Sequence, residues 1–91
     1  LVDADASVYT YSTSGLPTIQ IARYRSGVSN DMLSTKITID LTEYTSYTAA
    51  TQPVINTSYD DVQTGDFVRV DVDVAGTGTK GLDVILSFQL P

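Results

Sequence analysis

Asp71 and Asp73 have the spacing that paired-carboxylate chemistry needs, and they lie in the most regular part of the chain. They alternate with valines, so both side chains should leave the same face of a strand, about 6.6–6.8 Å apart. That separation lies at the edge of the roughly 6.5–9.5 Å found in inverting glycosidases. Arg69 shares this face, however, and no apolar residue is expected around the carboxylates to raise a pKa. We therefore predict a solvated or interface-facing acidic row rather than catalytic residues.

A second pair of carboxylates, Asp60 and Asp61, falls in a predicted loop. Calcium takes roughly six to eight oxygen ligands, which one such pair does not supply. The chain has no histidine and no cysteine, so Ser-His and Cys-His pairs, imidazole or thiolate metal sites and disulfides are excluded. We expect no metal, no cofactor and no enzymatic activity.

Three glycines, Gly76, Gly78 and Gly81, match the G-x-G-x-x-G spacing of dinucleotide-binding loops. In those sites the loop opens a helix whose N-terminus binds the pyrophosphate. Here the pattern leads into the alternating residues of another strand, beginning at Leu82. We therefore interpret the glycines as positive-φ positions in a wide turn and predict no nucleotide site.

Tyrosines are the remaining candidates for ligand contact, and the chain has six. A tyrosine offers a flat apolar face and a hydroxyl group, which suits stacking on a sugar or packing in an interface. Tyr44, Tyr47 and Tyr59 fall in or near loops in the middle of the chain. We take these three as candidate ligand-binding residues, with ordinary packing in a strand or an interface as the alternative.

The elements that position these residues follow from the period-2 alternation of apolar and polar side chains. The clearest stretch is 67–90, where alternate valines from Val68 to Val74 are followed, after a glycine-rich break, by alternate apolar residues from Leu82 to Phe88. This pattern predicts a long antiparallel hairpin whose valine face packs on the core.

Weaker alternation predicts further strands at 2–11, 18–25, 32–41 and 45–50 and a short edge segment at 54–55. Loops are expected at 12–17, 26–31, 42–44 and 56–65, the last with one helical turn near 60–63. No window has the apolar period of a longer helix. About six to eight strands with closely spaced turns indicate one all-β domain, an antiparallel β-sandwich of jelly-roll-like type. Residues 1–16 would form an N-terminal strand and linker, and residues 17–91 the main β-domain.

The expected core consists of the inward-facing residues of these strands. They are Ile19, Ile21, Ile37, Ile39, Leu41, Val54, Val68, Val70, Val72, Val74, Leu82, Val84, Leu86 and Phe88. Burial of these side chains contributes less than the conformational entropy lost on folding, so a chain of this size is expected to gain stability by self-association or by attachment to neighbours.

Composition narrows the partners. Charged residues are only 18% of the chain and the net charge is −6, which disfavours nucleic acid and anionic lipid. No apolar run is long enough to span a membrane, and no signal peptide is visible. A hydroxyl-rich, charge-poor surface suits an extracellular or virion protein. The chain starts at Leu1, so we expect a processed product or part of a longer polypeptide.

Three segments carry a family resemblance: MLSTKITID (Met32 to Asp40), TAATQPVIN (Thr48 to Asn56) and GDFVRVDVDVAGTGTKGLDVILSF (Gly65 to Phe88). The last combines an acidic turn, an alternating strand, a glycine-rich loop and a final strand that starts with Gly-Leu. On these segments the chain from Pro17 to Phe88 resembles a small β-domain of bacteriophage tail-fibre, tail and head-fibre proteins. The resemblance implies no catalytic motif. It does imply a domain on the particle surface that is trimeric or repeated, so a homotrimer is the favoured assembly.

The first expectation of function is a non-enzymatic structural or adhesion module of a phage particle, in a tail fibre, a head fibre or a capsid decoration. It would be located on the virion and would contact other virion proteins, with a host-surface carbohydrate as a further candidate partner. The alternative from another class is a free-standing carbohydrate-binding module of a secreted microbial protein. A glycoside hydrolase built on Asp71 and Asp73 is a third hypothesis, but so small a domain leaves little room for a substrate cleft.

Overall fold

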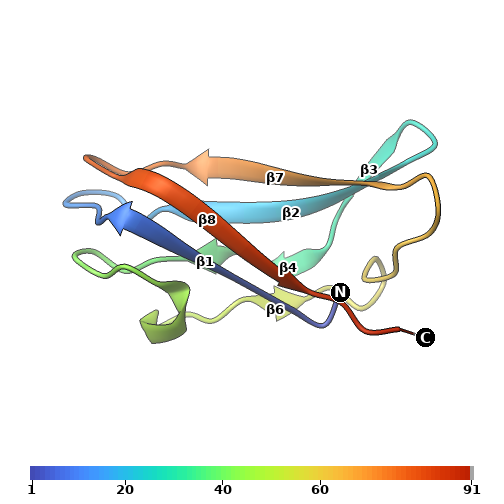
Figure 1. The fold of residues 1–91 in the computed structure, drawn as a ribbon, viewed down its shortest axis with the longest axis horizontal. Helices are drawn as coiled ribbons and strands as arrows, with labels where there is room; N and C mark the ends of the chain where they lie inside the picture. The colour runs from blue at the N-terminus through green and yellow to red at the C-terminus, as the bar shows by residue number, and fades with distance from the viewer. Residues whose placement is uncertain (91) are drawn as a thin grey trace.

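The computed structural model describes residues 1–90 and consists almost entirely of β-strands and loops (Figure 1). The elements are β1 (Asp3–Thr10), β2 (Thr18–Arg25), β3 (Val28–Asp31), β4 (Leu33–Thr35), β5 (Ile37–Thr38), one 3-10 turn η1 (Ser46–Thr48), β6 (Val54–Ile55), β7 (Phe67–Val74) and β8 (Lys80–Ser87). Within this described part, no helix is long and apolar enough to cross a membrane. The predicted fold class, an all-β antiparallel sandwich, is confirmed.

Two sheets face each other across the core. β2 is the central strand of the larger sheet and pairs antiparallel with β7 along one side and with β3 and β5 along the other. β1 and β8 form the second sheet, and β4 and β6 form a short antiparallel pair. In Figure 1, β1 and β8 run together obliquely to β2 and β7. β7 and β8 each pair with a single strand in the described chain.

The predicted hairpin at the C-terminal end is wrong in the partner of each strand. β7 and β8 both exist and follow each other in sequence, but β7 pairs with β2 and β8 pairs with β1. The loop between them therefore crosses from one sheet to the other. Alternation predicts which side chains of a strand share a face, but the same alternation fits any neighbouring strand.

The predicted core is confirmed at its centre and wrong at its margins. Ile19, Ile21, Ile37 and Ile39 have no exposed area. Leu82, Val84 and Leu86 of β8 pack against the core while partly buried. Buried residues that the prediction left out include Ala4, Ala6, Val8, Met32 and Leu33. Seven predicted core residues are instead exposed: Leu41, Val54, Val68, Val70, Val72, Val74 and Phe88. They lie in edge strands, loops or the chain end, where no further layer of the described chain covers them.

The segment 26–31 forms part of a hairpin rather than a loop. Ser26 and Gly27 both have positive φ, 52° and 81°, which is the backbone of a two-residue type I′ turn. The turn joins β2 to β3 with Arg25 opposite Val28. β3 was missed because its residues are mostly polar.

The segment 45–50 forms η1 instead of the predicted strand, and no helical turn forms at 60–63. Ser46 explains the first difference. Its hydroxyl donates a hydrogen bond to the Asp5 carboxylate at 2.8 Å and accepts one from the Ala6 N–H at 2.9 Å. The Ser46 side chain therefore holds this segment against β1. A strand at 45–50 would have been held by backbone hydrogen bonds instead.

The predicted strand at 32–41 is divided into β4 and β5 because the chain leaves β2 after Met32. The Met32 N–H still donates to the Ile21 carbonyl at 2.8 Å. One residue further, the Gln20 side chain replaces the backbone ladder. Its amide donates to the Leu33 carbonyl at 3.0 Å, and its Oε1 accepts from the N–H groups of Leu33 and Ile21 at 3.2 Å and 3.0 Å. This insertion lets β4 turn away and pair with β6.

Candidate functional site

The inner faces of β7 and β8 line an open side of the sandwich, which we call the β7/β8 mouth. It is defined by the inward-facing residues Val68, Val70, Val72, Leu82, Val84 and Leu86. The three valines face inward because they lie opposite Arg23, Ile21 and Ile19 of β2. The three β8 residues lie opposite Val8, Ala6 and Ala4 of β1, which are buried. Cross-strand partners share a face.

The β7/β8 mouth is apolar but only partly covered. Val68, Val70 and Val72 are 37%, 41% and 50% exposed, although their cross-strand neighbours Ile21 and Ile19 are fully buried. The three β8 residues are partly buried against the core. Such a continuous apolar row is unusual on the surface of a protein that works alone.

Two pockets mark the ends of the β7/β8 mouth. The smaller, about 140 Å³, lies under the glycine-rich loop and is lined by Ile19, Val72 and Leu82 among others. The larger, about 800 Å³, lies near the chain termini and is lined by Val68 and Phe88 among others. Val72 of β7 and Leu82 of β8 both line the smaller pocket, and Val68 of β7 and Phe88, which follows β8, both line the larger one. The two strands therefore flank the mouth along its length.

The outer edges of β7 and β8 also leave backbone groups without a strand partner in the described chain. Natural edge strands are usually protected by proline, lysine, inward-pointing charges or a short length. β7 is eight residues long, with the sequence FVRVDVDV, and has no proline and no lysine. Its charged residues are Arg69, Asp71 and Asp73. A register shift opposite Thr18 and Ile19 makes Asp73 an extra residue and places Val74 opposite Thr18. β7 therefore keeps a regular, pairing-competent edge from Phe67 to Val72.

The acidic row on the outer face of β7 is held by ion pairs. Arg69 contacts both carboxylate oxygens of Asp71, at 2.7 Å and 3.1 Å, and also the Ser29 hydroxyl. Lys36 contacts Asp73 at 2.7 Å. The hydrogen bond that Arg69 donates to Asp71 raises the pKa of Arg69, and the one that Lys36 donates to Asp73 raises the pKa of Lys36. Both carboxylates are thus matched by cations, which supports the interpretation of the row as a charged surface.

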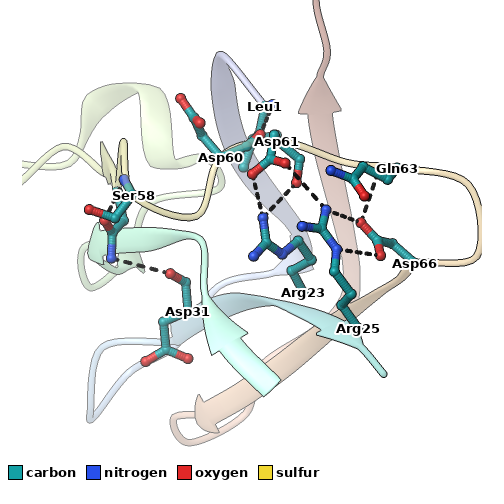
Figure 2. A network of polar contacts seen from close by, with 10 residues as sticks. Leu1, Arg23, Arg25, Asp31, Ser58, Asp60, Asp61, Gln63 and Asp66 are labelled. Atoms are coloured by element: carbon teal, nitrogen blue, oxygen red, sulfur yellow. Dashed lines mark hydrogen bonds and ion pairs between the residues drawn. The ribbon is translucent and has the colours of Figure 1, made fainter. Parts of the chain in front are cut away.

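A second group of ion pairs fastens the loop that leads into β7 (Figure 2). Arg23, only 6% exposed and on the inner face, donates to the Asp61 carboxylate at 2.5 Å and to the Asp61 carbonyl at 3.0 Å. Its guanidinium also lies 5.6 Å from the centre of the Tyr59 ring. Arg25 binds both oxygens of Asp66 at 2.8 Å and 2.6 Å.

These contacts shift the acid–base properties of the loop. The Arg25 hydrogen bond lowers the pKa of Asp66 to about 2. Partial desolvation acts to raise the pKa of Asp61, but the hydrogen bonds from Arg25 and Arg23 outweigh it and lower the value. From the sequence, Asp61 was considered as one half of a carboxylate pair with Asp60. In the structure its carboxylate is bound by Arg23 and Arg25. The sequence alone did not predict the pairing of Asp61 with Arg23 and Arg25.

The three candidate tyrosines do not share one site. Tyr44 and Tyr47 are 51% and 61% exposed near η1, and the Tyr44 carbonyl accepts from the Val8 N–H. Tyr59 lies in the 56–66 loop, where its ring faces the Arg23 guanidinium. The next residue in this loop, Asp60, accepts a hydrogen bond from the amino group of Leu1. Because Leu1 and Val8 are seven positions apart along extended chain, the two places are separated by on the order of 20 Å.

Two tyrosines not singled out from the sequence, Tyr9 and Tyr11, lie in and just after β1. Tyr11 packs edge-on against the Tyr44 ring at 5.4 Å. Tyr9 is 85% exposed on β1, and it covers Gly81, where an added Cβ would come within 2.7 Å of the Tyr9 Cβ. The alternation of β1 was the available signal, since it places Tyr9 and Tyr11 on the outer face.

The glycine-rich loop packs against the turn at 12–16, to which Thr77 is hydrogen-bonded. Thr77 donates from its N–H to the Ser14 carbonyl at 2.8 Å, and its carbonyl accepts from the Thr13 N–H at 3.0 Å. The same Thr77 N–H also lies 3.2 Å from the Ser12 hydroxyl. The loop leads into β8 and not into a helix, so the G-x-G-x-x-G spacing here belongs to loop packing.

No protein-family model, curated protein or solved structure matches the chain.

Proposed function

We propose that this domain is a non-enzymatic structural module of a phage particle, part of a tail fibre, a head fibre or a capsid decoration. The observation that carries the proposal is the β7/β8 mouth, an apolar row on two edge strands with no covering layer in the described chain. A surface of this kind suits a subunit that works inside a larger assembly. The sequence resemblance to phage virion domains supplies the kind of assembly, and the proposed partners are other virion proteins or further copies of this chain.

The state of the carboxylates supports a structural role. Asp61, Asp66, Asp71 and Asp73 are all bound to arginine or lysine. A general acid needs a raised pKa, whereas the pKa of Asp66 and that of Asp61 are lowered. These groups hold loops and strands in place.

Contact with a host-surface carbohydrate is a further part of the proposal, and Tyr44 with Tyr47 is its best-placed pair. Both residues are about half exposed or more, and exposed aromatic side chains suit stacking on sugars. The same observation favours the second candidate function, a carbohydrate-binding module of a secreted protein. The two functions differ in where the protein is found.

Immunogold electron microscopy of phage particles from the encoding organism, with antibodies raised against this domain, tests the proposal. Labels on the tail or the capsid of intact particles are the expected result. Antigen that stays in the particle-free culture fluid after the particles are removed would contradict the virion role and favour the secreted module.

A further inference from the structure

We infer that the partner on the β7 edge is a second copy of this chain, whose β7 pairs antiparallel with the first about a two-fold axis at Val70. This inference rests on the proposed function, because it names the contact through which the structural module assembles.

The charge pattern of β7 is self-complementary in one register. When two antiparallel copies are centred on Val70, Arg69 of each copy lies opposite Asp71 of the other. Opposite charges directly across a strand pair stabilise it, and like charges destabilise it. Because Arg69 already contacts Asp71 within its own strand at 2.7 Å, the pair of strands would carry four alternating charges in one cluster.

Other centres lose this match. An axis at Asp71 places the two Asp71 carboxylates against each other, and an axis at Arg69 does the same with two guanidinium groups. An axis between residues would put inward and outward side chains opposite each other, which strand pairing does not allow. Val70 is therefore the centre that matches every charge between Val68 and Val72.

The same register joins the apolar residues. Val70 lies opposite its own counterpart, and Val68 lies opposite Val72 of the other copy. All three are inward-facing and 37–50% exposed, so the contact extends the inner face of one sandwich into that of the next. The register shift that makes Asp73 an extra residue falls outside this stretch. The paired segment is thus the regular part of the edge.

A three-fold assembly, which the sequence resemblance implies, does not produce this contact. Copies related by a three-fold axis meet through unlike surfaces, whereas the antiparallel pairing of identical strands requires a two-fold axis. The charge pattern of β7 therefore favours a pair of chains over a trimer.

Charge reversal in a mixture of variants tests the inference. Arg69→Asp alone leaves only carboxylates facing each other across the axis, and Asp71→Arg alone leaves only guanidinium groups. Each variant alone should therefore dimerise about tenfold more weakly than the parent, or worse. Mixed together, the two variants place opposite charges across the axis at both positions. The mixture should then recover the parent's affinity in sedimentation equilibrium, as a complex of one chain of each kind.

The design separates the interface from the fold. Neither variant regains its own ion pair between positions 69 and 71 on mixing, so recovery requires a contact between chains. Glu43→Arg makes the same change of charge as Asp71→Arg, but in an exposed loop, and should leave dimerisation unchanged. Circular dichroism checks that every variant is folded.

Disulfide trapping gives a second measurement, since the chain has no cysteine of its own. Val70→Cys should form a disulfide-linked dimer on oxidation because antiparallel partners bring the two Cα atoms within about 4.5–5.5 Å. Val54→Cys, 51% exposed on β6, should stay a monomer. Variants that do not recover on mixing, or a Val70→Cys chain that does not cross-link faster than Val54→Cys, would overturn this inference. Either result would leave the virion role to be decided by the particle labelling.

Discussion

Gly76 and Gly78 lie in the same loop and have nearly the same backbone conformation, with φ of 78° and 79°, yet their surroundings differ. A Cβ on Gly76 would collide with the Ser12 side chain and would lie 2.7 Å from the Gly15 carbonyl oxygen, whereas a Cβ on Gly78 would meet nothing within 4 Å. The two positions therefore separate the cost of the left-handed backbone from the cost of a clash.

Gly76→Ala should destabilise the domain more than Gly78→Ala. The second change costs about 1–2 kcal/mol for the left-handed conformation alone, and the first adds the displacement of the 12–16 turn. Urea denaturation of both variants beside the parent measures the difference. Equal losses would mean that the two loops do not pack against each other in solution.

The ion pair between Arg25 and Asp66 predicts a dependence of stability on pH. The hydrogen bond from Arg25 lowers the pKa of Asp66 to about 2, against about 3.9 in an unfolded chain. The folded protein therefore keeps the carboxylate ionised where the unfolded chain takes up a proton. Its stabilising contribution is fully present above the unfolded pKa and is lost as the pH falls through about 2.

Asp66→Asn should thus lower the melting temperature at neutral pH, and the gap to the parent should shrink as the pH falls from about 4 towards 2. Asp60→Asn makes the same change in the same loop, at a side chain to which the structure assigns no hydrogen bond, and is the control. A gap for Asp66→Asn that stays constant over this range would show that the ion pair does not form.

At the scale of elements, β2 and β7 carry neighbouring apolar residues in very different surroundings. Ile21 and Val70 are cross-strand partners, but Ile21 is fully buried and Val70 is 41% exposed. Ile21→Ala should cost about 2–5 kcal/mol of unfolding free energy. Val70→Ala should cost about 1 kcal/mol or less, because much of its area already meets water.

Urea denaturation at low protein concentration, where a second chain does not cover β7, measures both losses. An equal loss for the two variants would mean that Val70 is covered within the single chain. Val70→Asp, for the same reason, should leave a folded domain with a moderate loss of stability.

The strands themselves were largely readable from the sequence, and their neighbours were not. The alternations at 18–25, 68–74 and 82–88 predicted β2, β7 and β8, because the period of side chains is a local property. That β7 pairs with β2 and β8 with β1 is a long-range property, and no residue within either strand encodes it visibly. The pairing of β2 with β3 is the exception, because it is local in sequence. The Ser26-Gly27 pair followed by a polar run could have been interpreted as a hairpin.

At the scale of the whole molecule, the centre of the core was predictable and its margin was not. Isoleucines such as Ile19 and Ile37 belong to strands that any compact arrangement would bury. The exposure of Val68, Val70 and Val72 depends on the number of layers outside β7, which alternation does not report. The burial of Arg23 could not be predicted from local alternation either, because its inward position is stabilised by Asp61, 38 residues further along the chain.

The candidate site was predictable only as a residue pattern. The charged face of β7 was recognised as a surface, but its role as an edge follows only from the pairing of the strands in the sheet. The tyrosines were recognised as exposed aromatic residues, but the separation of Tyr59 from Tyr44 and Tyr47 follows from the path of β1 and the 56–66 loop.

Sedimentation equilibrium of the 91-residue chain and of its Val70→Asp variant, over a wide range of concentration, tests most directly whether the β7/β8 mouth is a surface of assembly. The mass of the parent should rise with concentration from one chain to two. The variant should stay at one chain while circular dichroism shows it folded, because the change buries a charge opposite its counterpart in the other copy. A parent that remains at one chain throughout, or a variant that associates as strongly as the parent, would contradict the account.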